Sequence, residues 1–414
     1  MLDRPGGVVE RIGALVAAHL DEVVALRRDL HAHPEVAHTE SRTTALVADR
    51  LRAAGLTPHL MPGTGLVCDI GPTVVSSGRK PVALRADLDA LPVPDTCSAP
   101  WRSTVPGASH ACGHDVHAAV VLGAGLVLAE LARSEALPAG VRLIFQAAEE
   151  MQDGALAAVD AGAMDGVGLV FAVHCAPGVD AGHVGLRPGP ITAASDPVAV
   201  TLTSDGGHTS RPHLTGDVVF ALGQVITQVP AVLGRRLDPR AGVNLTWGQV
   251  QAGSVANAIP ATGSVRGTLR CLDTRAWEEA GTVLREAVEH VVAPYRVTVD
   301  VQHVRGVPPV ENDPYATRLL EAAARECLGA DAVEVTEQSL GGEDFAWLLT
   351  RAPGALARLG TRTPGGRTFD LHRGDFTVDE TAISTGITLL ARVALLAGER
   401  PDPAVVPPAA RLPR

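Results

Sequence analysis

The sequence predicts an α/β protein in which a second, smaller domain interrupts the first. Short apolar runs at 140–150 and 166–177 are typical of strands buried on both faces, and a long apolar helix is predicted at 118–136. Around residue 190 the pattern changes to strand, helix, strand, strand, helix, strand, and after residue 304 the first pattern resumes. Strands that alternate with helices in this way favour a sheet covered by helices.

The length and composition favour some classes of protein over others. A chain of 414 residues with 46% hydrophobic and 20% charged residues suits two domains with large cores. The net charge of −11 includes no long charged run, so we expect no nucleic-acid partner. Gly, Asp or Arg interrupts the apolar stretches before the roughly 20 residues that a membrane helix needs, so we expect no membrane partner. Neither do the first residues resemble a signal peptide, and six scattered cysteines favour the reducing cytoplasm.

The first part of the larger domain is predicted over residues 1–190. An amphipathic helix over 8–30 ends before Pro34, because the residue in front of a proline disfavours the helical conformation. A strand over 80–92 runs into a loop. The helix over 118–136 is expected to begin at the end of the stretch HACGHDVHAA at 110–119.

The inserted domain is predicted over residues 191–304. Strands are expected at 196–204, 242–253, 261–273 and 295–303, and helices at 215–233 and 274–292. This β-α-β-β-α-β order is that of a ferredoxin-like sandwich. Residues 305–400 complete the larger domain with helices at 313–329 and 379–399, and the Pro-rich segment 401–414 is predicted to be a flexible tail.

Side chains that bind metals follow several of the predicted strands. They are Asp87 and Asp89 after the first strand, Glu149 and Glu150 after the second, His174 after the third, Cys112 and His114 before the long helix, and His372 late in the chain. Because ligands collect at the carboxyl ends of strands in α/β sheets, we expect these side chains to share one edge of the sheet.

Each of these residues has an ordinary structural explanation when it is taken alone. Cysteine is often buried, paired glutamates often occupy a solvated turn, and a single histidine is more often structural than a ligand. Their joint placement is harder to explain, since a thiol, imidazoles and carboxylates in one cleft would repel or desolvate one another. A divalent cation removes that cost, so the sequence predicts a metal site.

Six motifs then identify a resemblance to a known family. RRDLHAHPE, LRADLDALP, HACGHDVHAA, FQAAEE, GGHTSRPH and LHRGDF, together with GGEDFAWLL, resemble the M20 metallopeptidases and follow the order of that family. The resemblance is strongest to the amidohydrolase branch, which includes hippurate hydrolases, hydrolases of auxin–amino acid (IAA–amino acid) conjugates and N-acetyldiaminopimelate deacetylases. It implies a zinc-peptidase-like catalytic domain with a mixed sheet, an inserted lid domain that dimerises, and two metal ions.

The resemblance also implies roles for individual residues. By their positions in the motifs, the expected metal ligands are Cys112 as the bridging ligand, His114, Glu150, His174 and His372. Glu149 resembles the general base and Asp89 an aspartate beside the site, whereas Asp87 stands where other branches carry a ligand histidine and is not expected to bind metal. In the lid, His208 resembles a histidine that reaches the active site of the partner subunit, and Asn257 an asparagine associated with the substrate carboxylate.

These roles are chemically consistent with hydrolysis of an amide in a small N-acyl amino acid. Two ions about 3.5–4 Å apart bridge a water molecule and lower its pKa towards about 7. Glu149 would take the proton of that water and pass it to the leaving nitrogen. A thiolate ligand favours Zn²⁺ over Mg²⁺, and Mn²⁺, Co²⁺ or Ni²⁺ remain open from the resemblance.

Other residues of the motifs have less specific interpretations. His31 and His33 are expected to be structural or to line the cleft, and His213 is ambiguous. His117 lies one helical turn after His114 and is a candidate to orient the site, while Asp115 is equally a candidate helix cap. Cys175 is expected to pack in the core.

Two alternative functions stay open at this stage. One is a dipeptidase or carboxypeptidase of the same family, and the other is a binding protein that depends on metal without catalysing a reaction. The second is disfavoured because every expected position is filled, Glu149 included. The sequence indicates neither the acyl group nor the amino acid.

Overall fold

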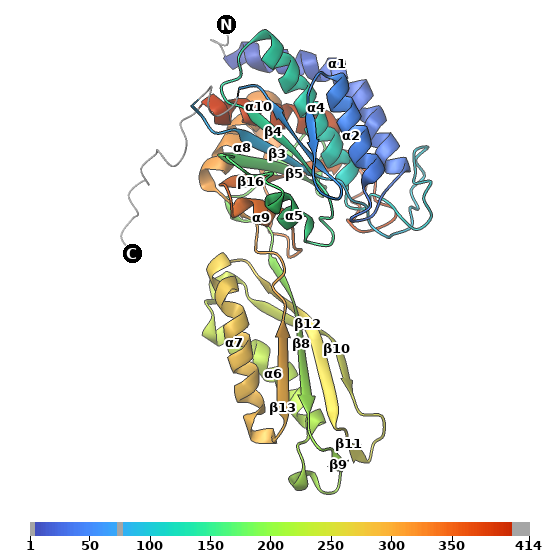
Figure 1. The fold of residues 1–414 in the computed structure, drawn as a ribbon, viewed down its shortest axis with the longest axis vertical. Helices are drawn as coiled ribbons and strands as arrows, with labels where there is room; N and C mark the ends of the chain where they lie inside the picture. The colour runs from blue at the N-terminus through green and yellow to red at the C-terminus, as the bar shows by residue number, and fades with distance from the viewer. Residues whose placement is uncertain (1–4, 73–77, 400–414) are drawn as a thin grey trace, which may run out of the picture. The chain divides into compact units, whose positions relative to one another are not determined.

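The computed structural model of the chain describes residues 5–72 and 78–399 and divides them into two compact units (Figure 1). Within the described ranges, the second unit comprises residues 190–311 and 338–346, and the first comprises the remainder. The predicted inserted domain, 191–304, lies inside the second unit. That unit extends further because Ile191 N–H donates to the carbonyl of Val310, which joins its two ends. The predicted tail at 401–414 lies outside the described residues.

A mixed eight-stranded sheet organises the first unit, in the order β1-β2-β4-β3-β5-β16-β6-β15. The four neighbouring strands β4, β3, β5 and β16 run parallel, while β2 is antiparallel to β4 and β6 is antiparallel to β16. The strands are β1 (Pro58–Leu60), β2 (Leu66–Ile70), β3 (Val82–Asp87), β4 (Val141–Gln146), β5 (Leu169–Asp180), β6 (Val184–Leu186), β15 (Val333–Val335) and β16 (Gly354–Arg362). The predicted α/β fold with a mixed sheet is confirmed.

Long helices pack against this sheet. The helices of the first unit are α1 (Pro5–Ala32), α2 (Ser41–Ala53), α4 (His114–Ser134), α5 (Gly154–Asp160), α8 (Pro314–Leu328) and α10 (Thr381–Glu399). The short helix α9 (Phe345–Leu349) lies at a boundary between the residue ranges of the two units. Helices α4 and α10 contact the central strands and each other, and α1 packs against both. Residues from these helices and from the strands, including Phe145 and Phe171, form one buried core.

Helix α4 begins earlier than the sequence suggested. The helix starts at His114 rather than at residue 118, so four residues of the HACGHDVHAA stretch form its first turn. Gly113 precedes it with a φ of 85°, a left-handed conformation that glycine adopts without the penalty of a side chain. The early start places His114 and His117 on the same face of the helix, with ring centroids 5.3 Å apart.

Within residues 5–72 and 78–399, three helices are long and apolar enough to cross a membrane by length and composition alone, namely α4, α10 and α6 (Val218–Arg236). The argument that apolar stretches are interrupted too early was therefore wrong for these segments, because isolated Gly and Arg residues do not lower their hydropathy enough. In α4 and α10, more than four-fifths of the apolar window is buried inside the structure. Packing against the central sheet accounts for the apolar character of these two helices.

The second unit contains a four-stranded antiparallel sheet with two helices. Its elements follow in the order β8 (Ala194–Thr203), α6 (Val218–Arg236), β10 (Asn244–Ala252), β12 (Thr262–Cys271), α7 (Thr274–Val292) and β13 (Thr298–His303), and the sheet order is β10-β12-β8-β13. Helices α6 and α7 pack against each other over a separate core that includes Val200, Leu222 and Leu284. A small ribbon of β9 (Gly207–His208) and β11 (Ala258–Ile259), and the pair β7 (Gly189–Pro190) and β14 (Glu311–Asn312), complete the sheets.

Candidate metal centre

The loop before α4 positions Cys112 and His114 through a glycine that separates them. A Cβ atom on Gly113 would lie 2.6 Å from Sγ of Cys175, closer than such atoms approach in proteins. Only glycine therefore fits between α4 and β5. The loop before α4 also contacts His372 from a distant part of the chain, because the backbone N–H of His372 donates to the carbonyl of Ala111 over 2.8 Å. His372 itself has a φ of 62°, a strained conformation that is enriched at functional sites.

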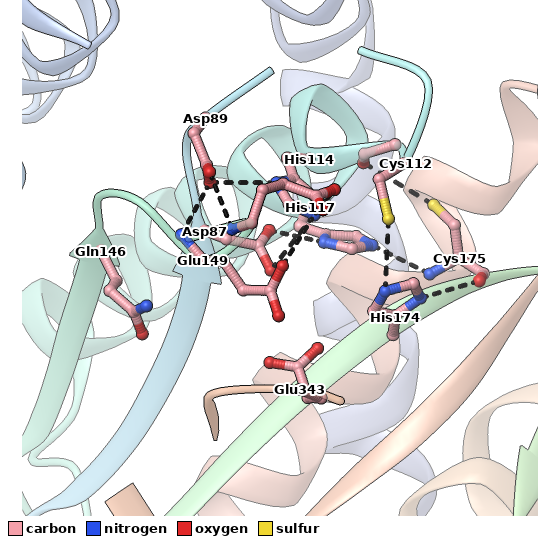
Figure 2. Close-up of polar contacts among 12 residues, drawn as sticks. Asp87, Asp89, Cys112, His114, His117, Gln146, Glu149, His174, Cys175 and Glu343 are labelled. Atoms are coloured by element: carbon pink, nitrogen blue, oxygen red, sulfur yellow. Dashed lines mark hydrogen bonds and ion pairs between the residues drawn. The ribbon is translucent and has the colours of Figure 1, made fainter. Parts of the chain in front are cut away.

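The turn after β4 positions Glu149 and Glu150, and Asp89 holds it. The backbone N–H of Glu149 donates to Oδ1 of Asp89 over 3.1 Å, and that of Glu150 donates to Oδ2 over 3.0 Å. The same Oδ1 lies 3.2 Å from Nδ1 of His114. The buried Asp89 carboxylate thus joins the carboxylate turn to the first residue of α4 (Figure 2). The family resemblance predicts a role for Asp89 beside the metal site, and that role stays a prediction.

His174 lies inside β5 rather than at its end. The strand continues to Asp180 because β16 pairs with it that far, whereas the neighbouring strand β3 pairs only as far as Ala172. His174 therefore projects from the part of β5 that lies beyond its last residue paired with β3. His174 thus lies near the predicted edge of the sheet, but the prediction that its strand ends at this residue is wrong.

The expected ligands form two groups that share Cys112. Cys112, His114 and His174 have ligand atoms within 4.8 Å of one another, and the same limit holds for Cys112, Glu150 and His372. Glu149 belongs to a third such group with His114 and Glu150. One ligand shared between two sets of ligands is an arrangement that suits a bridged pair of ions.

Two buried atoms in this cluster make no hydrogen bond. They are Nε2 of His114 and Oε1 of Glu150. The Nδ1 atom of His114 already faces Asp89, and Nδ1 of His174 contacts the carbonyl of Cys175 at 2.9 Å, which leaves its Nε2 3.7 Å from Sγ of Cys112. Imidazoles that bind metal ions are oriented in this way by a partner on the second nitrogen. The residues present fit a pair of divalent cations.

The electrostatics differ between the two buried histidines of the cluster. Burial lowers the pKa of His114, but Asp87, Cys112 and Asp89 together raise that pKa well above its ordinary value. Burial and Arg358 lower the pKa of His174, so its ring stays neutral, which is the form that binds metal. Burial raises the pKa of the Cys112 thiol, and a coordinated metal reverses this effect because it stabilises the thiolate.

Asp87 and His117 lie next to this cluster but have both of their polar atoms occupied. Nδ1 of His117 contacts Oδ1 of Asp87 at 2.6 Å, and Nε2 accepts the backbone N–H of Cys175 over 2.8 Å. Oδ2 of Asp87 accepts from Arg85 over 2.8 Å. Asp87, His117 and His114 also have ligand atoms within 4.8 Å of one another. Because Asp87 and His117 already hydrogen-bond to other groups, they are better suited to support the site than to bind an ion. Cys175 is buried, as expected for a core residue.

A separate buried network surrounds His31. Asp115 is not a helix cap, because its Oδ2 lies 2.8 Å from both Nδ1 of His31 and Nε of Arg27. Nε2 of His31 faces Asp95 at 3.4 Å, so the histidine joins α1 to the loop that precedes α4. His33 follows the end of α1, is half-exposed and contacts the backbone carbonyl of Asp29 in that helix. Sequence reasoning missed Arg27, although it stands four residues before His31 on the same helical face.

In the second unit, His208 and Asn257 come together on one ribbon. His208 in β9 pairs with Ala258 in β11, and the carbonyl of Asn257 accepts the N–H of Thr209. The backbone N–H and the hydroxyl of Ser210 both contact Nδ1 of His208, at 3.1 and 2.8 Å. Because a backbone N–H can only donate, Nδ1 is an acceptor, and the proton of the neutral ring sits on Nε2. His213 is exposed in a short 3₁₀ turn.

The fold and the site define a metal-dependent amide hydrolase, and the comparisons with known proteins agree. A sequence profile of peptidase family M20/M25/M40 matches residues 83–396, so the chain belongs to this family. It is a hydrolase of the M20 type that acts on amide bonds.

Particular relatives are similar over most of the chain. The YxeP protein of Bacillus subtilis, whose crystal structure is described as that of a dinuclear metal-binding peptidase, has a TM-score of 0.80 and 30% identity over 92% of this chain and 99% of that one. The N-acetyl-L-cysteine deacetylase of Bacillus subtilis is 34% identical over 87% of this chain and 85% of its own length. A Rhodococcus jostii protein named "Putative glutamate--cysteine ligase 2-3" is 47% identical over 92% of this chain, which spans only 47% of that longer protein.

Proposed function

We propose that this chain hydrolyses the amide bond of N-acyl amino acids with two divalent metal ions held by Cys112, His114, Glu150, His174 and His372. The observation that carries the proposal is the pair of ligand groups that share Cys112, with Glu149 beside them. The dinuclear site named for the YxeP protein and the deacetylase activity named for the second relative support it.

Glu149 acts as the general base in this proposal. Bound ions would polarise the amide carbonyl and lower the pKa of the attacking water. The Glu149 carboxylate takes one proton from that water while the oxygen of the water attacks the acyl carbon. The same proton passes to the nitrogen as the C–N bond breaks, so the products are a carboxylic acid and a free amino group. Asp89 keeps Glu149 in place through the backbone hydrogen bond of the turn.

The proposed metal is Zn²⁺ or Mn²⁺, with Co²⁺ and Ni²⁺ as further candidates. The Cys112 thiol and the imidazoles favour a softer ion than Mg²⁺. The thiol must also stay reduced to bind a metal. All six cysteines of the chain are free in the structure, and we retain the cytoplasm as the proposed compartment.

We further propose that the protein is a homodimer in which His208 serves the active site of the partner. The Nε2–H tautomer fixed by Ser210 is a hydrogen-bond donor, which suits stabilisation of the developing oxyanion. Asn257, on the same ribbon, is the proposed contact for the substrate carboxylate. The edge strand β10 with its exposed Val250 gives a second copy a place to pair.

Mixing two inactive variants tests the shared site. His208→Ala protein and Glu149→Gln protein are combined under conditions of subunit exchange, which is followed by mass spectrometry of tagged chains. Heterodimers would contain one site with both native residues, and activity should recover to about a quarter of the wild-type level if exchange is random and each site works independently. Exchange without recovery would show that His208 does not act across subunits.

A substrate panel tests the proposed activity. We expect N-acetyl-L-cysteine and other N-acetyl amino acids to be hydrolysed by the metal-loaded protein, and Glu149→Gln protein to be the inactive control. Cysteine is the first amino acid to test because two relatives from Bacillus subtilis are named as N-acetylcysteine deacetylases. Faster hydrolysis of dipeptides would favour a dipeptidase, and metal binding without any hydrolysis would favour a binding protein.

A further inference from the structure

Glu40 is a fully buried carboxylate that the sequence did not single out. It directly precedes helix α2, where a side chain usually caps the first turn, yet its side chain makes no cap hydrogen bond. Glu35 performs this task instead, since its two carboxylate oxygens accept the backbone N–H groups of Arg42 and Thr43 over 3.0 and 2.8 Å. The Glu40 carboxylate is therefore available for another role.

The Glu40 carboxylate turns towards the metal-binding side of the first unit. Its Oε1 accepts the backbone N–H of Ala148 over 2.8 Å and that of His38 over 3.1 Å, and its Oε2 accepts the hydroxyl of Thr64 over 2.7 Å. Among the described residues it forms no ion pair with a cationic side chain. Three donors thus replace water around a buried charge, an arrangement that is costly unless each donor is in place.

Ala148 is the residue that needs this support. It has a φ of 52°, in the left-handed region that costs a residue with a side chain about 1 kcal/mol or more, and it directly precedes Glu149 and Glu150. The next two backbone N–H groups, those of Glu149 and Glu150, are accepted by Asp89. Two buried carboxylates from distant segments therefore hold three consecutive N–H groups of one turn.

We propose that Glu40 is a positioning residue that holds Ala148 in its left-handed conformation and so aims Glu149 and Glu150. The alternative is that Glu40 only anchors the start of α2 through His38 and Thr64. The two roles differ in whether the hydrogen bond from Ala148 to Glu40 is needed to orient Glu149 and Glu150. The proposal rests on the proposed roles of Glu149 and Glu150, so the experiment includes a measurement that does not depend on them.

The decisive comparison is between Glu40→Ala and Thr64→Val. Both remove a hydrogen bond of the Glu40 carboxylate, but only the first frees the N–H of Ala148. We expect Glu40→Ala to weaken binding of one of the two metal equivalents about 10- to 100-fold, because only one of the two groups that share Cys112 contains Glu150, and to lower kcat by a similar factor. Thr64→Val should leave the metal affinities and kcat within about twofold of wild type.

Hydrogen exchange supplies the independent measurement. Peptides that contain residues 147–150 should exchange faster in Glu40→Ala protein, with no such change in Thr64→Val protein. If Glu40→Ala does not fold, Glu40→Asp replaces it, since the shorter side chain keeps the charge but cannot reach all three donors. Unchanged exchange in the turn, or faster exchange with native metal affinities and kcat, would overturn the proposal. Wild-type protein that binds no metal would instead overturn the proposed function, and exchange in the turn would still test the contact.

Discussion

Replacement of Asp89 by asparagine should weaken metal binding without unfolding the protein. The carboxylate accepts two backbone N–H groups and faces Nδ1 of His114, and burial leaves it no access to water. An asparagine keeps one oxygen and places an NH₂ group against one of these donors. One unsatisfied buried N–H costs about 1–3 kcal/mol, which corresponds to a loss of metal affinity of roughly 5- to 150-fold if the metal-bound state alone requires the ordered turn.

A competition titration with a chromophoric chelator measures this affinity, and kcat is measured at saturating metal. Asp95→Asn is the matched control, because Asp95 also accepts two backbone N–H groups, those of Cys97 and Ser103, but contacts none of the proposed ligands. The reasoning would be refuted if Asp89→Asn protein bound metal within twofold of wild type. An equal loss in both variants would also refute it, since the effect would then be general destabilisation.

Three further predictions address the base, the loop and the buried histidine. Glu149→Gln should retain two metal ions but lower kcat about 10²- to 10⁴-fold in steady-state assays, and a near-normal kcat would assign the base elsewhere. Gly113→Ala should lower Tm and metal content, because its Cβ would lie 2.6 Å from Sγ of Cys175 at a φ of 85°, and an unchanged Tm would contradict this. Burial lowers the pKa of His31, but Asp115, Asp95 and Cys97 together raise that pKa to about 10. The stabilisation by protonated His31 is therefore complete below about pH 6.5 and is lost as the pH rises to about 10. Urea unfolding at pH 6 to 10 should show a steeper loss of stability for wild type than for His31→Gln, and parallel curves would count against it.

Much of this architecture could be predicted from the sequence because it follows from local patterns. Buried strands in a parallel sheet require continuous apolar runs, and the residues that follow them meet at one edge whatever the details of packing. That rule predicts that Asp89 and Glu149, which follow two neighbouring strands, share one site. Helix boundaries were less certain, and α4 begins at His114 because the left-handed Gly113 allows a helix to start there.

The sequence by itself determined the fold class and the kinds of side chain at the site, whereas the tertiary structure decided what each atom does. His114 and His117 are three residues apart on one helix, yet only His114 keeps a nitrogen without a hydrogen bond, since Asp87 and the backbone of Cys175 occupy both nitrogens of His117. Glu40 contacts Ala148 across 108 positions of sequence. Spacing along a chain fixes which residues can share a face, but hydrogen bonds between distant segments fix tautomers, orient carboxylates and hold strained turns, and these partners exist only after the chain has packed.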